Sequence, residues 1–199
     1  ITFNDAPSLD QFNQVDIATT GLLTYSSIAD SAANLRADAA LGLSAIARNK
    51  PITVTNTGTV QASDLVTISG NTSSTVTATA ASTISGSALD LLSVIQDTGI
   101  STSSSYAAVI TGTANTNQIS RIDADTTGAV SVEEVDVVDT IGNISSFNVS
   151  FADILEAALT VTANGNNNND FGDFSTVQRP MAINGGGGND SLTGTAFND

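Results

Sequence analysis

The sequence predicts an α/β fold in which about three strand–helix units of roughly 53 residues stack as a repeat solenoid, followed by a glycine-rich tail. Three observations support this expectation. Short motifs recur in the same order along the chain, and hydrophobic residues alternate between strand-like and helix-like spacing within each unit. The core residues are also small, with 7 Phe, 2 Tyr and no Trp among 199 residues. A strand–helix unit of this size cannot bury its own apolar face, so stacking must supply the core.

A polar turn followed by a strand-like pair anchors each predicted unit. It occurs at residues 19–23, 72–76 and 126–130, so that successive anchors are almost equally spaced along the chain. A single compact α+β domain with accidental internal similarity is the alternative. The repeat predicts units over residues 1–51, 52–107 and 108–159, then a linker or degenerate repeat over 160–184 and a tail over 185–199.

Capping signals and hydrophobic spacing predict the elements within these units. Ser8 with Gln11, and Asn115 with Gln118, place a polar N-cap three residues before a glutamine, which satisfies free amides at a helix start. Three-residue and four-residue spacing predicts further helices over 31–47, from Leu89 to about Gly99, and from Phe151 to about Leu159. Triplets and alternating stretches predict strands at 1–3, 52–54, 76–80, 108–110 and 130–132.

The charge excludes several classes of partner. Five basic residues stand against 20 acidic ones, for a formal net charge of −15. A nucleic-acid binder neutralises phosphates with basic side chains, so the sequence predicts no nucleic-acid partner. Apolar runs are too short to cross a bilayer, so no membrane insertion is expected. Strong acidity indicates either binding of divalent cations or solubility in salty surroundings.

The residue types needed for most catalytic sites are missing. The sequence has no Cys and no His, which removes thiolate chemistry and the usual base of a nucleophilic triad. Lys50 is the only lysine and lies beside Pro51, where an exposed connection is expected. The sequence therefore predicts a chain that is not an enzyme.

The tail carries a pattern with a specific chemistry. Residues 185–193 fit the nine-residue pattern Gly-Gly-x-Gly-x-Asp-x-aliphatic-x, and a second unit begins at residue 194. The pattern resembles the calcium-binding repeats-in-toxin (RTX) motif, which implies the start of a parallel β-roll. By this resemblance Ca²⁺ would be bound by carbonyls of Gly186 and Gly188 and carboxylates of Asp190 and Asp199. One and a half repeats make at most an incomplete site, and a plain glycine-rich linker is the alternative.

Two other stretches fit calcium patterns more loosely. Residues 165–173 contain Asp170 and Asp173 after a run of asparagines, and a flexible polar linker is the favoured interpretation there. Residues 123–134 place Asp123, Asp125 and Glu134 at positions one, three and twelve of a loop similar to an EF-hand. The internal repeat already accounts for the Thr-Thr-Gly within this loop, so a structural turn is favoured.

The combined pattern over about residues 1–160 resembles the repeats of very large bacterial secreted and surface proteins, including cyanobacterial ones. The resemblance implies a non-catalytic, calcium-associated structural segment of an adhesin, surface-layer or extracellular matrix or filament protein, located outside the cell. Its expected partners are calcium, other copies of itself and cell-surface components. The alternatives are a calcium-binding portion of a secreted toxin or hydrolase, or a receptor or carbohydrate-binding module. The last would need an exposed cluster of aromatic and Asn/Asp groups.

Overall fold

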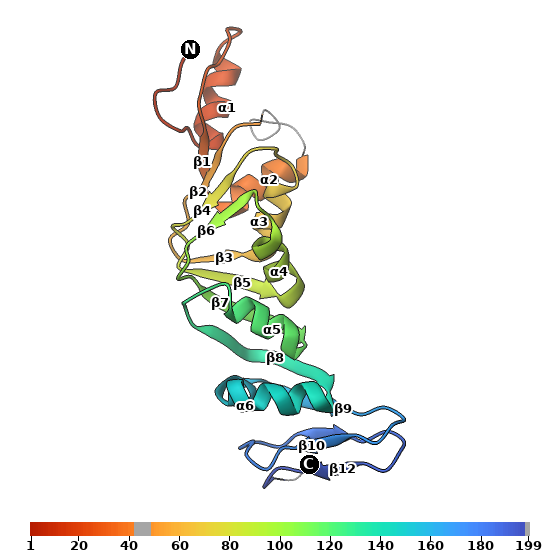
Figure 1. The fold of residues 1–199 in the computed structure, drawn as a ribbon. Coiled ribbons are helices and arrows are strands. Elements are labelled where there is room, and N and C mark those ends of the chain that lie inside the picture. Colours follow the sequence, from red (N-terminus) through yellow and green to blue (C-terminus); the bar gives the residue numbers. More distant parts are fainter. Residues whose placement is uncertain (42–48, 198–199) are drawn as a thin grey trace. The chain divides into compact units, whose positions relative to one another are not determined.

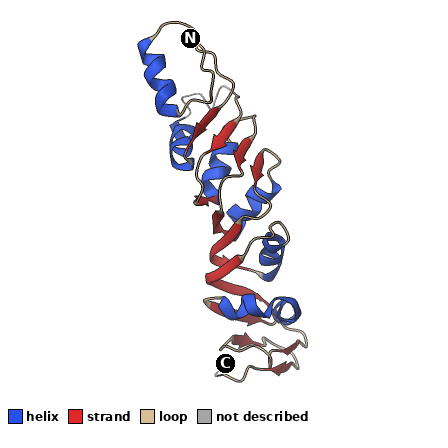
Figure 2. Cartoon of the chain, turned by 90° about the vertical axis from the view of Figure 1, so that its left-hand side faces the viewer, coloured by secondary structure: helices blue, strands red, loops and turns tan. Residues whose placement is uncertain are grey.

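The computed structural model describes residues 1–41 and 49–197, and the chain divides into two compact units. Unit 1 comprises Ile1–Gly86, Asp90–Ala107 and Asp125–Gly128; unit 2 comprises Ser87–Leu89, Ala108–Ala124 and Ala129–Asp199. Strand and helix segments alternate along the chain as far as residue 157, beyond which the described elements are strands (Figures 1 and 2), and the described strand pairs are parallel. The predicted α/β class is confirmed.

Unit 1 contains two groups of paired strands. The first consists, side by side in this order, of β1 (Ile28–Asp30), β2 (Ile52–Val54), β4 (Val76–Ala78) and β6 (Ile100–Thr102). The second is β3 (Thr59–Gln61) with β5 (Thr83–Ser87). Helix α1 (Leu9–Ala18) precedes these strands in the sequence, and between them lie α2 (Ala32–Leu41), α3 (Ala62–Ser69) and α4 (Ala88–Gln96).

Paired strands in unit 1 follow one another at a constant interval in the sequence. Ile28 pairs with Ile52, Ile52 with Val76, and Val76 with Ile100. Thr59 pairs with Thr83 at the same interval in the second group. Similar β-branched side chains therefore stack on one another in a column. In this column Ile28, Ile52 and Val76 are each at most 1% exposed. Such columns favour the extended backbone and bury apolar area at each paired strand.

Unit 2 also contains two groups of parallel strands. One is formed by β7 (Ala107–Ala114), β8 (Val130–Thr140), β9 (Thr160–Asn164) and β11 (Ala182–Asn184), and the other by β10 (Phe171–Asp173) and β12 (Ser191–Thr193). The helices are α5 (Thr116–Asp123) and α6 (Ile141–Ala157).

In unit 2 the number of residues between paired positions becomes smaller where helices give way to loops. Asp136 of β8 and its strand partner Thr160 of β9, which are also joined by their side chains, are 24 residues apart. In the turns that follow, the hydrogen-bonded residues Asp170 and Asp190 are only 20 residues apart. The pairing of Thr162 with Ala182 shows the same shorter interval.

The recurring anchors do not occupy equivalent positions in the structure. Leu23 lies before β1, Val76 opens β4 in unit 1, and Val130 opens β8, where it pairs with Ala108 in unit 2. The interval that the strand pairs repeat in unit 1, from Ile28 to Ile52 and onward, is less than half the anchor spacing. Thr, Gly and Val are abundant in this chain, so similar short strings occur at non-equivalent places.

The capping signals located two helices correctly. Both capping boxes are present, with Ser8 and Gln11 at the start of α1 and Asn115 and Gln118 at the start of α5. The other predicted helices are found in part: α4 covers most of its predicted range, and the helix predicted over 31–47 is α2 as far as Leu41, beyond which it lies outside the described residues.

Helix α6 begins well before the predicted start. The Thr140 hydroxyl accepts a hydrogen bond from the Asn143 amide at 3.2 Å and caps the helix. Ile141, Ile144 and Phe147 then face the core at helical spacing. The predicted start at Phe151 is instead a kink, where φ is −135° and ψ is 37°.

Side chains from later in the chain accept hydrogen bonds from the N-terminal amides of three helices. The amide of Leu9 in α1 donates to Oδ2 of Asp30 at 2.9 Å, and the amide of Thr116 in α5 donates to Oδ2 of Asp139 at 3.0 Å. In α2 the Ala32 amide donates to Oδ1 of Asn56 at 2.8 Å. The first amides of a helix have no hydrogen-bond partner within the helix. These bonds therefore satisfy them and connect each helix start to a later segment of the chain.

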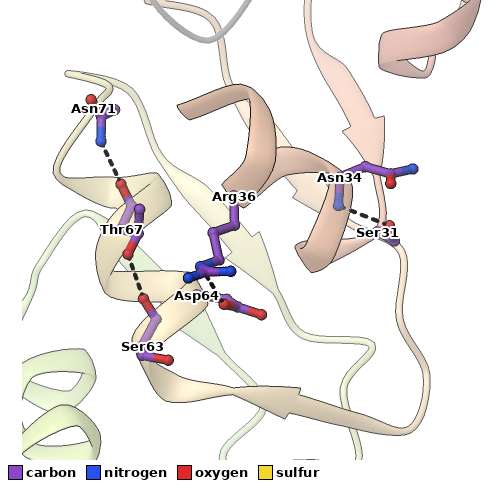
Figure 3. Close-up of polar contacts among 7 residues, drawn as sticks. All are labelled: Ser31, Asn34, Arg36, Ser63, Asp64, Thr67 and Asn71. Carbon is purple, nitrogen blue, oxygen red and sulfur yellow. Dashed lines mark hydrogen bonds and ion pairs between the residues drawn. The ribbon is translucent and has the colours of Figure 1, made fainter. Parts of the chain in front are cut away.

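An ion pair joins two neighbouring helices in unit 1. Nε of Arg36 on α2 lies 3.1 Å from Oδ1 of Asp64 on α3, as Figure 3 shows. Burial raises the pKa of Asp64, and the Arg36 charge lowers it in part. Near the end of α3, Thr67 and Asn71 bond to backbone carbonyls one turn earlier.

Within the described residues, no helix is long and apolar enough to cross a lipid bilayer.

Candidate functional site

Two glycine- and asparagine-rich loops of unit 2 lie in register. Residues 165–173 and 185–193 each form a loop followed by a short strand, and β10 pairs with β12 so that Gly172 lies opposite Leu192. The loops are also bonded directly, because the Gly187 amide donates to the Asn166 carbonyl and the Ser191 amide to the Asp170 carbonyl, both at 2.8 Å. Residues 165–173 are therefore part of the same paired structure as the RTX-like motif, not a connection outside it.

The aspartates of the two loops occupy corresponding places. Oδ2 of Asp170 accepts from the amide of Asn166 at 2.9 Å. The Asp170 amide donates to Oδ1 of Asp190 at 3.0 Å, so this bond connects the two loops. Each carboxylate also lies against the first glycine of its own loop: a Cβ on Gly165 would be 2.8 Å from Oδ2 of Asp170, and one on Gly185 would be 2.5 Å from Oδ2 of Asp190.

The glycines of the second loop are required by its geometry. Gly186 has φ of 78° and Gly188 has φ of 109°, in the region that side chains disfavour. A Cβ on Gly186 would be 2.2 Å from the Asn166 carbonyl oxygen, and one on Gly188 would be 2.4 Å from that of Asn168. These two residues allow the second loop to approach the carbonyls of the first closely.

The donor chemistry of the paired loops fits calcium. Ca²⁺ takes six to eight oxygen ligands from carboxylates, amides and backbone carbonyls, and the paired loops offer these groups without any nitrogen or sulfur ligand. Within the described part of the chain, no three acidic side chains gather closely enough to hold a metal ion. The two aspartates would therefore depend on carbonyl and amide oxygens for most of the coordination. Asp199 lies outside the described residues.

Asp173 is engaged in its own turn. Its Oδ1 accepts from the Ser175 amide at 3.0 Å, just after β10. Hydrogen bonds from the Ser175 amide and hydroxyl lower the pKa of the Asp173 carboxyl. This arrangement closes a turn and differs from that of Asp170 and Asp190, which connect the two loops.

The EF-hand-like residues are spread over different elements. Asp123 ends α5, Glu134 lies exposed within β8 opposite Thr111, and Asp125 belongs to unit 1. An EF-hand loop leads into a second helix, whereas this stretch leads into an extended strand. Within the described residues, these three carboxylates are not brought into one group.

The Thr-Thr-Gly of this stretch holds a turn instead. The Thr126 hydroxyl donates to the carbonyl of Tyr106, and the Thr127 amide donates to that of Ser104 at 2.9 Å. A Cβ on Gly128 would lie 2.2 Å from the Tyr106 oxygen, so only glycine fits. The buried Tyr106 hydroxyl donates to Oδ2 of Asp125 at 2.9 Å, and burial together with this bond raises the pKa of Tyr106 well above its usual value.

A recurring string in the sequence could have predicted the pairing of the two loops. The string Asn-Gly followed later by Asp occurs at Asn164–Asp170 and again, with the same spacing, at Asn184–Asp190. The carbonyl groups of Asn166 and Asn168, which face the second loop, were not among the predicted ligands.

Comparison with protein-family models, curated proteins and solved structures finds no match for the chain.

Proposed function

We propose that this chain is a non-catalytic, calcium-associated structural segment of a large secreted or cell-surface protein. The observation that carries the proposal is the in-register pairing of two Gly/Asn/Asp loops, in which Asp170 and Asp190 take corresponding positions. Adhesins, surface layers and extracellular matrix proteins are the settings in which such a segment serves. Calcium is its ligand, and other copies of the chain or cell-surface components are its partners.

We also propose that the strand–helix turns form an α/β solenoid and that the paired loops begin a parallel β-roll. Support comes from the columns of like residues, in which Ile28, Ile52 and Val76 follow one another at a constant interval. The shorter interval between Phe171 and Ser191 supports the smaller turns of the roll. Each turn rests on the previous one, as expected when a single turn cannot bury its own apolar side.

The aspartates give calcium a role in stability. Two carboxylates in adjacent loops repel each other, and this repulsion grows as the loops pack together. A bound divalent cation would neutralise the pair and reverse the sign of the interaction. The residues of this chain would then hold the loops in register by the bond between the Asp170 amide and Asp190, with the glycines permitting the close approach.

A calcium titration of the whole 199-residue chain tests the proposal. Calorimetry and circular dichroism should report binding and a gain of ordered structure in the natural chain, and neither in the double variant D170N/D190N. D16N, which changes an exposed aspartate of α1 in the same way, is the matched control and should behave as the natural chain does. Equal binding by all three proteins would refute the assignment to these loops, as would the absence of binding in the natural chain.

A further inference from the structure

Helices α5 and α6 border two adjoining hollows on unit 2. The first, of about 330 Å³, is lined by α5 residues from Thr116 to Ser120 and α6 residues from Asn143 to Phe151. The second, of about 340 Å³, is lined by Asp123 and by residues 149–154. Ser150 and Phe151 line both. The two hollows form one groove, which we call the α5–α6 groove.

Hydroxyl and amide groups dominate the first hollow. Asn117 and Ser120 come from α5, and Ser146 and Ser150 come from α6. The side chains of these four residues form no hydrogen bond with any other residue in the part of the chain that the structure describes. Each such group can both donate and accept, and here that capacity is directed to solvent or to a ligand.

Aromatic rings and carboxylates complete the groove. The rings of Phe147 and Phe151 stack with centroids 4.6 Å apart, and Phe147 is 6% exposed, so the partly exposed Phe151 offers the accessible ring. The second hollow adds the carboxylates of Asp123 and Asp153. No basic side chain is among the residues that line either hollow.

These four polar side chains, all within the described part of the chain, form no bond between α5 and α6, in contrast to the ion pair between two helices of unit 1. There the Arg36–Asp64 ion pair spans neighbouring helices at 3.1 Å (Figure 3). Among the described residues, α5 and α6 have no such ion pair between them. The acidic residues that line the groove, Asp123 and Asp153, belong to the second hollow, and the residues that line the first are uncharged.

We propose that the α5–α6 groove binds a neutral oligosaccharide. Sugar hydroxyls pair with groups that donate and accept, as the Ser and Asn side chains do, and the carboxylates of Asp123 and Asp153 accept from further hydroxyls. The apolar C–H face of a sugar ring packs on an aromatic ring such as Phe151. The two hollows together have the volume of a ligand pocket of a few hundred Å³. Absence of basic lining and the net charge of −15 exclude anionic saccharides.

Titration of the intact chain with defined probes tests this proposal. The probes are neutral hexasaccharides of β-1,4-linked glucose, α-1,4-linked glucose and N-acetylglucosamine, with a trisaccharide of galacturonic acid as the anionic probe. At least one neutral probe should bind, as followed by calorimetry. The variant F151A and the surface variant N117A/S146A should each weaken binding by about tenfold or more. F171A removes a phenylalanine that is 74% exposed outside the groove and should bind as the natural chain does.

The possible outcomes separate the proposal from calcium binding. D170N/D190N should keep its saccharide affinity, because neither aspartate lines the groove. Circular dichroism checks that each variant is folded; if F151A unfolds at the α6 kink, N117A/S146A decides the question. The proposal is overturned if none of the neutral probes binds, if only the anionic probe binds, or if N117A/S146A binds as tightly as the natural chain.

Discussion

Asp30 and Asp139 each connect two turns of the chain through one carboxylate. In both, Oδ2 accepts from the first amide of an earlier helix, at Leu9 and Thr116 respectively. Oδ1 accepts from the next residue and from an asparagine four residues on, which is Asn34 or Asn143. The motif Asp-Ser/Thr-x-x-Asn thus satisfies backbone groups of two turns at once.

Removal of the Asp139 carboxylate should destabilise the chain. In D139A the buried Thr116 amide and hydroxyl lose their acceptor, and an unsatisfied buried group costs about 1–3 kcal/mol. Urea unfolding at pH 7 measures this loss. D16A, on an exposed face of α1, is the control and should change the free energy of unfolding by less than about 0.5 kcal/mol.

The effect of Asp139 should depend on pH. Burial raises its pKa, but the hydrogen bonds from Thr116, Asn143 and Thr140 lower it, and the net pKa is below the usual value. A carboxyl with a lowered pKa in the folded state stabilises the fold above its unfolded pKa of about 3.9. This contribution is lost as the pH falls through the folded-state pKa. The stability difference between the natural chain and D139A should therefore shrink below about pH 4; a difference that stays constant down to the acid transition would contradict this account.

Two glycine-to-alanine changes should have opposite effects. G128A places a methyl group 2.2 Å from the Tyr106 carbonyl oxygen and should cost about 1–3 kcal/mol or more. G142A lies within α6, where an added Cβ meets nothing within 4 Å, so it should be neutral or stabilise the helix by up to about 1 kcal/mol. Thermal melts of both variants check this; equal melting temperatures would show that the Thr126–Gly128 turn tolerates a side chain.

At the scale of elements, α6 is held at both ends by residues outside its own turns. The Thr140 hydroxyl caps its start. At its C-terminal end, the Arg179 guanidinium donates to the carbonyls of Leu155, Glu156, Ala158 and Leu159, the last at 2.6 Å. A cation at this position also opposes the negative end of the helix dipole. The loop that carries Arg179 is thereby bonded to the segment in which α6 ends and β9 begins.

Loss of the Arg179 guanidinium should loosen this end of α6. R179A removes charged donors to four carbonyls and should lower the free energy of unfolding by about 1.5–3 kcal/mol. R179K keeps the charge but lacks the planar fork, so it should recover only part of the loss. R121A, which removes the basic residue of the last turn of α5, is the control, with an expected loss of about 0.3–1 kcal/mol. Recovery of full stability in R179K would show that a positive charge alone stabilises this end of α6, and that the planar guanidinium is not needed.

Local chemistry made some elements predictable and left others hidden. The capping boxes at Ser8 and Asn115 satisfy amides within four residues, so sequence alone could locate them. Sequence spacing placed the start of this helix at Phe151, although Ile141, Ile144 and Phe147 already recur at helical spacing on the near side of the kink. The pairing of residues 165–173 with 185–193 depends on register between distant segments, which a search for local motifs does not test.

At the scale of the whole molecule, the net charge of −15 opposes folding through self-repulsion. The Arg36–Asp64 ion pair neutralises one carboxylate, but five basic residues cannot neutralise 20 acidic ones. Hydrogen bonds from amides and hydroxyls stabilise the carboxylates at Asp30 and Asp139 instead. Such a chain depends on its counterions more than one with balanced charge.

The melting temperature should therefore rise with salt. Sodium chloride screens repulsion between exposed carboxylates, and its effect should be similar in the natural chain and in D170N/D190N. Calcium chloride at equal ionic strength should add a further rise in the natural chain only, since binding to the folded state stabilises it by mass action. A melting temperature that falls with sodium chloride would contradict the repulsion argument. An equal calcium effect in both proteins would place the ion elsewhere.

The caps supplied by a later turn also constrain how a gene for such a chain can grow. Leu9 is served by Asp30, Ala32 by Asn56 and Thr116 by Asp139, across 21, 24 and 23 residues. A duplicated stretch that ends inside one of these intervals separates a helix start from its acceptor. A stretch that carries both leaves that amide with its acceptor. Recombination between copies should therefore be tolerated where a junction keeps each helix start with its acceptor, and penalised where it separates them.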